Sequence, residues 1–253
     1  MEHIRVQNVT KTFRSGFNVS PIIASTSFTV GAGEIVAIVG KSGCGKSTLL
    51  HLLGGLEAPT SGNIQICGTV TLVPQKDLLL PWRTVLQNCI LPIEIVHGNI
   101  QSAKKKALAL LQQYGLISYA TQLPSFLSGG MRQQVGLIRA IVHNTDITLL
   151  DEPFSALDYD ARLTIGKELR NYMKEKNKTV IFVTHNIEEA ILLSDRVIVF
   201  SGKPCTIVLN KKIDLKESLR DTVRIRRTPL FNELFETIWN LIAAKQTYEA
   251  TTS

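Results

Sequence analysis

The sequence lacks several features that define whole classes of protein. No apolar run approaches the roughly 18 residues that a membrane-crossing helix needs, so we expect no such span. Residues 1–10 alternate polar and apolar side chains and carry no basic-then-apolar secretory signal. The four cysteines include no CxxC pair, which argues against a disulfide framework and against a zinc site. Together these absences favour a protein of the reducing cytoplasm.

The composition is that of a folded protein with a mild excess of positive charge. Of 253 residues, 44% are hydrophobic and 19% are charged, which suits one large domain or two small ones and excludes general disorder. Lys and Arg number 28 against 21 Asp and Glu, so the net charge is +7. This balance favours an anionic partner such as a nucleotide, a nucleic acid or a lipid headgroup, although an ordinary basic surface explains it equally well.

Short apolar runs alternate with helical patterns along much of the chain. The runs are rich in Ile and Val and resemble strands buried on both faces, at residues 34–39, 147–151, 179–184 and 197–200. Residues 160–176 carry an apolar stripe at helical spacing. A further helix begins at Asn186, and Glu189 three residues later approximates a capping box. Strands that alternate with helices predict a parallel α/β sheet.

Other parts of the chain follow different patterns. From about residue 84 to residue 143 the patterns are helical, which predicts a helical insert in the α/β core. The first 30 residues and residues 61–73 contain β-branched residues and turn signals, which predict an antiparallel β layer at the sheet edge. After residue 202, a charged segment at 203–227 precedes an amphipathic stretch at 229–242.

Residues 40–48 match the phosphate-binding pattern GxxxxGK[ST] and follow the predicted strand 34–39. The glycines let backbone amides turn inward toward a phosphate, which the N-terminus of the next helix also attracts. In this pattern Lys46 reaches the β and γ phosphates, and the Ser47 hydroxyl ligates Mg²⁺. The predicted nucleotide-binding residues are Gly40, Lys41, Ser42, Gly43, Cys44, Gly45, Lys46, Ser47 and Thr48.

Two adjacent carboxylates, Asp151 and Glu152, stand at the exit of the apolar run 147–151. Charges are rarely left at the end of a buried strand without a partner cation, although carboxylates also cap helices. Asp151 is placed to hold Mg²⁺ through water. Glu152 points the other way and is placed to orient or deprotonate an attacking water.

Residues 127–131, LSGGM, precede an amphipathic helix and closely resemble the LSGGQ signature of ATP-binding cassette (ABC) ATPases. The family's other loops occur in the family's order. Phe13 stands at the A-loop, Gln75 at the Q-loop, residues 155–158 (SALD) at the D-loop and His185 at the H-loop. Each motif alone is common, but their ordered conjunction is specific to this family.

The resemblance implies a fold, a domain arrangement and an activity. The fold is α/β, with a P-loop NTPase (RecA-like) parallel-sheet core, an antiparallel β layer and an inserted helical subdomain. An ABC ATPase domain would occupy residues 1–225, with the helical insert at about 76–144, and a C-terminal helical tail would occupy 226–253. The activity would be hydrolysis of ATP with Mg²⁺.

Three single residues take roles from the resemblance. Phe13 would stack on adenine, unless it is a simple core residue. Gln75 would touch the Mg²⁺ shell or the attacking water, unless it is a surface amide. His185 would contact the γ-phosphate, unless it is a satisfied core histidine. Glu152, His185 and Gln75 are thus the predicted catalytic residues. The predicted metal ligands are Ser47, Gln75 and Asp151.

The signature loop implies a second copy of the chain. In this family, the clamp formed by Ser128, Gly129 and Gly130 lies far from the P-loop of its own chain. Two copies would therefore meet head to tail, each supplying its clamp to the γ-phosphate held by the other. Cys44 departs from the common Ser, and we expect this change to be tolerated. Met131 replaces the common Gln, a substitution that occurs in the importer branch described next.

Residues 76–88 (KDLLLPWRTVLQN) resemble a run found in importers for nitrate, taurine, aliphatic sulfonates and thiamine pyrimidine precursors. This branch implies a separate membrane permease, a substrate-binding protein and a location on the cytoplasmic face of the cell membrane. Trp82 would contribute to a groove for the permease, or would pack in the core of the insert. No residue reports which solute is carried.

A soluble ABC ATPase acting on nucleic acid or ribosomes is the alternative, and the net charge of +7 suits it. Such proteins generally carry paired cassettes, coiled-coil insertions or zinc modules, and none is visible in the sequence. We therefore expect no nucleic-acid partner.

Overall fold

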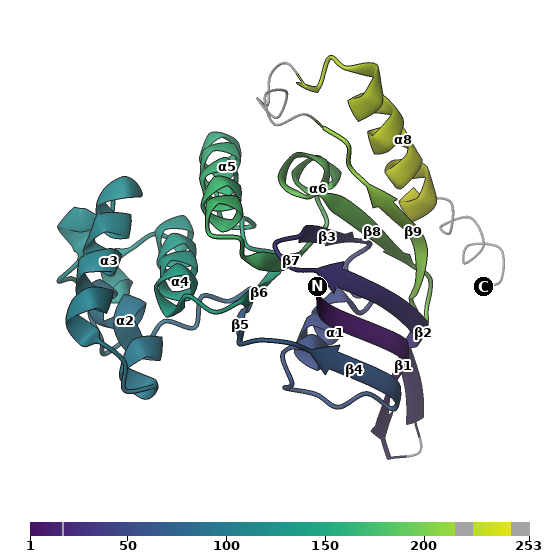
Figure 1. The fold of residues 1–253 in the computed structure, drawn as a ribbon, viewed down its shortest axis with the longest axis horizontal. Coiled ribbons are helices and arrows are strands. Elements are labelled where there is room, and N and C mark those ends of the chain that lie inside the picture. Colours follow the sequence, from purple (N-terminus) through teal and green to yellow (C-terminus); the bar gives the residue numbers. More distant parts are fainter. Residues whose placement is uncertain (17, 216–224, 244–253) are drawn as a thin grey trace.

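The computed structural model describes residues 1–16, 18–215 and 225–243, and these residues form two sheets flanked by helices (Figure 1). The larger sheet has the order β5-β6-β7-β3-β8-β9, in which the pairs from β5 to β8 are parallel and β9 is antiparallel to β8. Its strands are β5 (Val70–Val73), β6 (Ile147–Asp151), β7 (Thr179–Thr184), β3 (Ile35–Val39), β8 (Arg196–Ser201) and β9 (Thr206–Lys212).

The smaller sheet is antiparallel and has the order β2-β1-β4. Its strands are β1 (Glu2–Ser15), β2 (Asn18–Gly31) and β4 (Ser61–Ile66). Together with helix α1 (Lys46–Leu53), this sheet covers one face of the larger sheet, where one apolar cluster joins Ile4 of β1, Ile38 of β3 and Leu49 of α1.

The central strand β3 explains why both faces of the larger sheet are covered. All five of its residues are buried, and successive side chains point to opposite faces of a strand. Val36 and Ile38 belong to the cluster beneath the smaller sheet, whereas Ile35, Ala37 and Val39 belong to the cluster on the helical side. This is the pattern expected of a parallel strand between two layers.

Helices α5 (Tyr159–Glu175), α6 (Ile187–Leu193) and α8 (Pro229–Ala243) lie on the second face of the larger sheet (Figure 1). A separate group is formed by α2 (Val85–Ile95), α3 (Ile100–Gln113) and α4 (Gly129–His143), with short 3-10 turns at Ile117–Tyr119 and Pro124–Phe126. In the chain, this group lies between β5 and β6.

The expected antiparallel layer is present, but it is shorter than the sequence suggested. Residues 61–66 join it, whereas Val70–Val73 pair in parallel with β6 in the larger sheet. The turn explains the change of sheet. Gly68 adopts a φ of +121°, and the Asp146 carboxylate accepts hydrogen bonds from both the amide and the hydroxyl of Thr69. These contacts direct the chain to the edge of β6.

The C-terminal part is more ordered than its charge pattern indicated. Within the predicted charged segment 203–227, residues 206–212 form β9, and 216–224 lie outside the described residues. Helix α8 matches the amphipathic stretch and buries Phe231, Leu234 and Ile238, while residues 244–253 of the predicted tail also lie outside the described part. In the described part of the chain, no helix is both long and apolar enough to cross a membrane.

Candidate functional site

The register of the parallel strands brings three predicted loops to one edge of the larger sheet. Val39 pairs with Thr184, and Asp151 pairs with Val183. The residues that follow these pairs therefore leave the sheet side by side, at the carboxyl ends of its strands. This is the edge where open α/β sheets bind ligands.

Glycine is required at two positions of the phosphate-binding loop. A Cβ atom on Gly40 would lie 2.5 Å from the carbonyl oxygen of Phe200, which is backbone and cannot swing away. Gly45 has a φ of +106° and stands directly before α1, where a Cβ would lie 2.8 Å from Ile22 Cγ2. The loop is thus pressed between β8 and β2, and its shape follows from backbone packing.

Lys46 begins helix α1 and is only 6% exposed. Its Nζ donates to the carbonyl oxygens of Gly40, at 2.8 Å, and Lys41, at 2.9 Å. The ammonium group is therefore held over the loop, and because it has three donors, one remains for a phosphate oxygen. Burial raises the pKa of the neighbouring Cys44 thiol, although the charge of Lys46 opposes this, so Cys44 acts as a small apolar residue.

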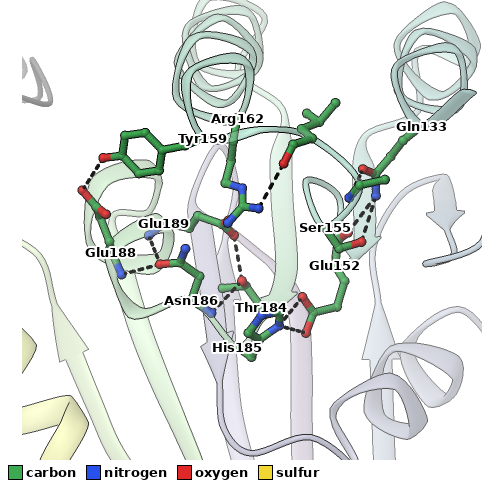
Figure 2. A network of polar contacts seen from close by, with 12 residues as sticks. Gln133, Glu152, Ser155, Tyr159, Arg162, Thr184, His185, Asn186, Glu188 and Glu189 are labelled. Carbon is green, nitrogen blue, oxygen red and sulfur yellow. Dashed lines mark hydrogen bonds and ion pairs between the residues drawn. The ribbon is translucent and has the colours of Figure 1, made fainter. Parts of the chain in front are cut away.

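Glu152 and His185 form a pair at this edge (Figure 2). Glu152 has a φ of +49°, and its amide donates to the carbonyl of Val183. Its carboxylate oxygens lie 2.8 and 3.0 Å from His185 Nδ1. A carboxylate only accepts, so Nδ1 carries the proton and Nε2 is left as the second functional nitrogen of the ring. The His185 side chain is 64% exposed, which makes that nitrogen accessible.

Gln133, in α4, connects the signature helix to this pair. The side chain is buried, and its Nε2 donates to the carbonyl oxygen of Glu152 at 3.0 Å and to Ser155 Oγ at 3.3 Å. Its Oε1 accepts from the amide of Ala156 at 2.9 Å. One amide group thus fixes the backbone on both sides of the turn that follows β6 (Figure 2). The sequence signal for it is weak: a polar residue four positions before the buried Leu137.

The loop around His185 is also held by side chains. Asn186 caps α6 as predicted, because its Oδ1 accepts from the amides of Glu188 and Glu189. The capping-box expectation for Glu189 is wrong, however. The Asn186 amide donates to Thr184 Oγ1 at 3.0 Å, and the Thr184 hydroxyl in turn donates to Glu189 Oε2 at 2.7 Å. Glu189 therefore holds the residue before His185 rather than the cap.

Arg162, in α5, is the second partner of Glu189. Its Nη1 lies 3.4 Å from Glu189 Oε1, and its Nη2 donates to the carbonyl oxygen of Leu157, in the D-loop, at 3.1 Å. Burial raises the pKa of the Glu189 carboxyl. The Thr184 hydroxyl and the Arg162 charge act in the opposite direction. Arg162 belongs to no motif that the sequence singled out, and Glu189 was predicted only as part of a helix cap.

The Q-loop leaves the larger sheet after β5, whose Val73 pairs with Leu150 of β6, and it lies next to the signature loop. Ser128 is the N-cap of α4 and accepts from the Met131 amide at 3.3 Å. Gln75, Gly129 and Ala156 line one hollow. Helix α4 packs against α2 and α3, whereas α1 lies beneath the smaller sheet (Figure 1).

Two arginines of α4 fasten the chain just after Gln75. Arg132 Nε donates to the Asp77 carboxylate at 2.9 Å, and Arg139 donates to the carbonyl oxygens of Asp77 and Leu78 at 3.0 and 3.1 Å. These contacts connect the segment after Gln75 directly to the signature helix.

Phe13 lies on the β1–β2 hairpin, where it pairs with Ser20. Its ring is 40% exposed, and the Lys11 ammonium lies 4.7 Å from the ring centroid. The ring therefore lies outside the core and packs against the Lys11 side chain. The hairpin reaches the P-loop through Ile22 instead.

Comparison with known proteins decides the family, because the sequence profile of the ABC transporter family matches residues 23–155. This chain belongs to that family. The formylaminopyrimidine import ATP-binding protein ThiZ of Halalkalibacterium halodurans is 44% identical to it over 73% of this chain and 75% of the relative. The aliphatic sulfonates import ATP-binding protein SsuB 2 of Agrobacterium fabrum is 40% identical over 88% of this chain and 84% of the relative.

The structure agrees with a solved ABC cassette. A dimeric ATP-binding cassette in a post-hydrolysis state, bound to ADP and Pi, superposes with a TM-score of 0.77 at 31% identity over 84% of this chain and 100% of the other. The expected P-loop NTPase fold is therefore confirmed, and the chain is an ABC ATPase that binds ATP.

Within this ABC ATPase, the predicted site residues fall into three groups. The P-loop, Asp151, Glu152 and His185 share one edge of the sheet. Gln75 and Gly129 of the signature loop line one hollow. Phe13 stands alone on its hairpin.

Proposed function

We propose that this chain is the ATP-hydrolysing subunit of an importer that carries a small solute through a separate membrane permease. The Glu152–His185 pair at the edge where the P-loop leaves the sheet is the observation that carries the hydrolytic role. The importing role is supported by two relatives whose names assign them to import of formylaminopyrimidine and aliphatic sulfonates. Both are similar to this chain over more than two thirds of its length.

Hydrolysis uses the three groups at the sheet edge. Lys46 binds the β and γ phosphates, because its ammonium is already directed over the loop by Gly40 and Lys41. Glu152 accepts a proton from the attacking water. His185 contacts the γ-phosphate in its doubly protonated form, in which Nδ1 donates to Glu152 and Nε2 donates to a phosphate oxygen. Gln75 approaches the site from the Q-loop and responds to its occupancy.

The same edge suits Mg²⁺. Ser47, Gln75 and Asp151 offer hydroxyl, amide and carboxylate oxygens, the hard donors that this ion prefers. Asp151 is 6% exposed, and a buried carboxylate at a strand end is stabilised by a cation. Held by these residues, Mg²⁺ would supply positive charge against the negative charge that develops during phosphoryl transfer.

A working site needs two copies of the chain. The clamp residues Ser128, Gly129 and Gly130 stand at the N-terminus of α4, which attracts an anion. They lie on the part of the chain that packs with α2 and α3, not beside α1. Head-to-tail pairing brings the clamp of one copy to the P-loop of the other.

The permease docks on the helical group next to β5. A groove there is lined by apolar side chains, among them Leu91 and Ile95 of α2, together with Arg139 and His143 of α4. Trp82, between the Q-loop and α2, is 72% exposed. It therefore does not pack in the core of the insert, and an exposed Trp of this kind is typical of a contact surface.

The imported solute belongs to the nitrate, taurine, sulfonate or pyrimidine classes. A separate substrate-binding protein and the permease select it, while this chain works at the cytoplasmic face of the membrane and makes no contact with the solute. Nucleic acid is not a partner in this assignment.

Purification of the tagged chain from membranes, followed by mass spectrometry, tests the assignment. A polytopic permease should copurify in stoichiometric amount, and recovery of ribosomal particles instead would support the nucleic-acid alternative. Trp82→Ala should then lose the stimulation of ATPase activity by the permease while the isolated chain keeps its basal rate.

Trp239→Ala is the matched control, because Trp239 is also exposed, at 57%, but lies on α8. It should retain both activities. Loss of basal turnover and folding in Trp82→Ala would contradict the docking role.

A further inference from the structure

The D-loop and the loop that carries His185 are joined by a continuous series of side-chain contacts (Figure 2). The two loops belong to different parts of the sequence. Leu157 stands before α5, and His185 stands between β7 and α6. No motif connects them, so the link is visible only in three dimensions.

The first half of this series of contacts is made by the guanidinium of Arg162. One of its nitrogens donates to the carbonyl oxygen of Leu157 at 3.1 Å, and the other lies 3.4 Å from Glu189 Oε1. Glu189 is 5% exposed and the Arg162 side chain is 23% exposed, so the contact is partly shielded from water, which strengthens it relative to a fully exposed pair. A planar guanidinium holds both partners in one fixed geometry.

The second half of this series of contacts ends at the residues on both sides of His185. Glu189 Oε2 accepts from the Thr184 hydroxyl at 2.7 Å, and that hydroxyl oxygen accepts from the Asn186 amide at 3.0 Å. Thr184 is 1% exposed and is the last residue of β7. Through the Thr184 hydroxyl, Glu189 is thus connected to the residues on both sides of His185.

We propose that Arg162 is a positioning residue that ties the orientation of His185 to the D-loop through Glu189 and Thr184. The proposal rests on the catalytic role proposed for His185. Arg162 touches no reacting atom; it keeps the His185 ring aligned with Glu152. A displacement of the Leu157 carbonyl is felt at the imidazole, so turnover depends on the state of the D-loop.

Helix α5 provides a matched control for this role. Arg170 lies eight residues further along the same helix and also uses its two terminal nitrogens on one carbonyl and one carboxylate: Leu193 O at 3.0 Å and Asp195 Oδ1 at 2.9 Å. Asp195 precedes β8 and its carboxylate accepts from the Ile35 amide, so this pair lies at the opposite, amino end of the strands. Both arginines stabilise α5, but only Arg162 faces the catalytic edge.

The test is a double-mutant cycle in the full chain, with ATP turnover measured for Arg162→Met, His185→Ala and the double variant. Arg162→Met should lower kcat between about 10-fold and 100-fold with little change in the KM for ATP, the range expected when a reacting group is misplaced by a distant change. In the His185→Ala background the same substitution should lower kcat less than about twofold, because the group that it positions is gone. Arg162→Lys, which keeps the charge but not the fork, should recover part of the loss.

Arg170→Met should lower the melting temperature as much as Arg162→Met does, while its kcat per folded chain stays near that of the wild type. The proposal would be overturned if Arg162→Met lowered kcat by the same factor with and without His185. It would also be overturned if Arg170→Met lowered kcat as much as Arg162→Met does. NMR gives a readout that does not depend on turnover. The ring resonances of His185 should shift in Arg162→Met and stay in place in Arg170→Met, and unchanged resonances in both would also overturn the link. If His185→Ala were fully active, the catalytic role of His185 would be wrong. The NMR comparison would still test whether Arg162 is linked to the His185 ring through Glu189 and Thr184.

Discussion

The two loop systems that meet at the sheet edge are built in different ways. The P-loop takes its shape from backbone packing, because Gly40 and Gly45 leave room for neighbouring chain where any side chain would collide. The loops of Glu152 and His185 are held by side chains from other elements, namely Gln133 of α4 and Arg162 of α5. A loop that is shaped by backbone packing depends on residues close together in the sequence, so it can be recognised as a sequence motif. Parts built from side chains depend on distant residues and can be changed one contact at a time.

The largest effect is expected from removing the buried ammonium group of the P-loop. Lys46→Ala should abolish turnover, because the β and γ phosphates lose the ammonium that Gly40 and Lys41 hold in place. ATP binding by fluorescence and phosphate release are the measurements. Near-normal activity would refute the P-loop assignment.

The carboxylate of the second loop system should give the next largest effect. Glu152→Gln keeps the shape of the side chain but cannot accept a proton, so hydrolysis should slow by about 100-fold or more, the scale of general acid–base contributions. Binding should survive, and the variant should accumulate as an ATP-bound dimer in gel filtration. A monomeric, fully active variant would exclude the role of general base.

A backbone clash provides a milder break in the P-loop. Gly40→Ala forces the loop away from the Phe200 carbonyl and should cost about 1–3 kcal/mol of stability, as other overpacked sites do, and weaken ATP binding. Gly136→Ala is the control, since its Cβ would meet only Asp77 O at 3.9 Å inside a helix. Thermal unfolding with and without ATP distinguishes the two, and equal behaviour would mean that the loop does not need glycine.

The smallest effect on activity is expected at the amino end of the strands. Burial alone would raise the pKa of Asp195, but hydrogen bonds from Lys174 and the Ile35 amide, with Arg170, lower it below its ordinary value. A carboxyl whose pKa is lowered by folding adds stability above its unfolded pKa and loses it as the pH falls through the folded value.

Asp195→Asn should therefore unfold at a lower temperature than the wild type at pH 7, and the gap should narrow below about pH 4, where the unfolded carboxyl begins to protonate. Turnover per folded chain should be unchanged at pH 7. A gap that widens in acid would reverse the assigned sign.

The parts of the fold that sequence reasoning predicted are those with local signals. Strands such as β3 and β6 are continuous apolar runs, and the helix after Lys46 follows a fixed pattern. Strand β5 was predicted in the smaller sheet but lies in the larger one, because a run of three half-buried residues and one buried residue does not reveal its partner strand. Strand β9 was not predicted, because Lys211 and Lys212 at its end resemble a charged loop.

The same division holds within the candidate site. Lys46, Asp151 and Glu152 were predicted because their chemistry depends on neighbours in the sequence. Glu189 was assigned to its own helix cap, since a capping pattern is local, whereas its partners are Arg162 and the hydroxyl of Thr184. A contact across 27 residues leaves no spacing rule in one sequence.

The requirement for two copies is tested most directly by mixing two inactive variants and measuring ATPase activity. Ser128→Arg ruins the clamp but leaves the P-loop intact, and Lys46→Ala does the reverse, so each should be nearly inactive alone. Mixed dimers contain one complete site and should regain part of the activity. Full activity of Ser128→Arg by itself would contradict the account, because a bulky cation at the N-terminus of α4 could not leave a γ-phosphate contact there.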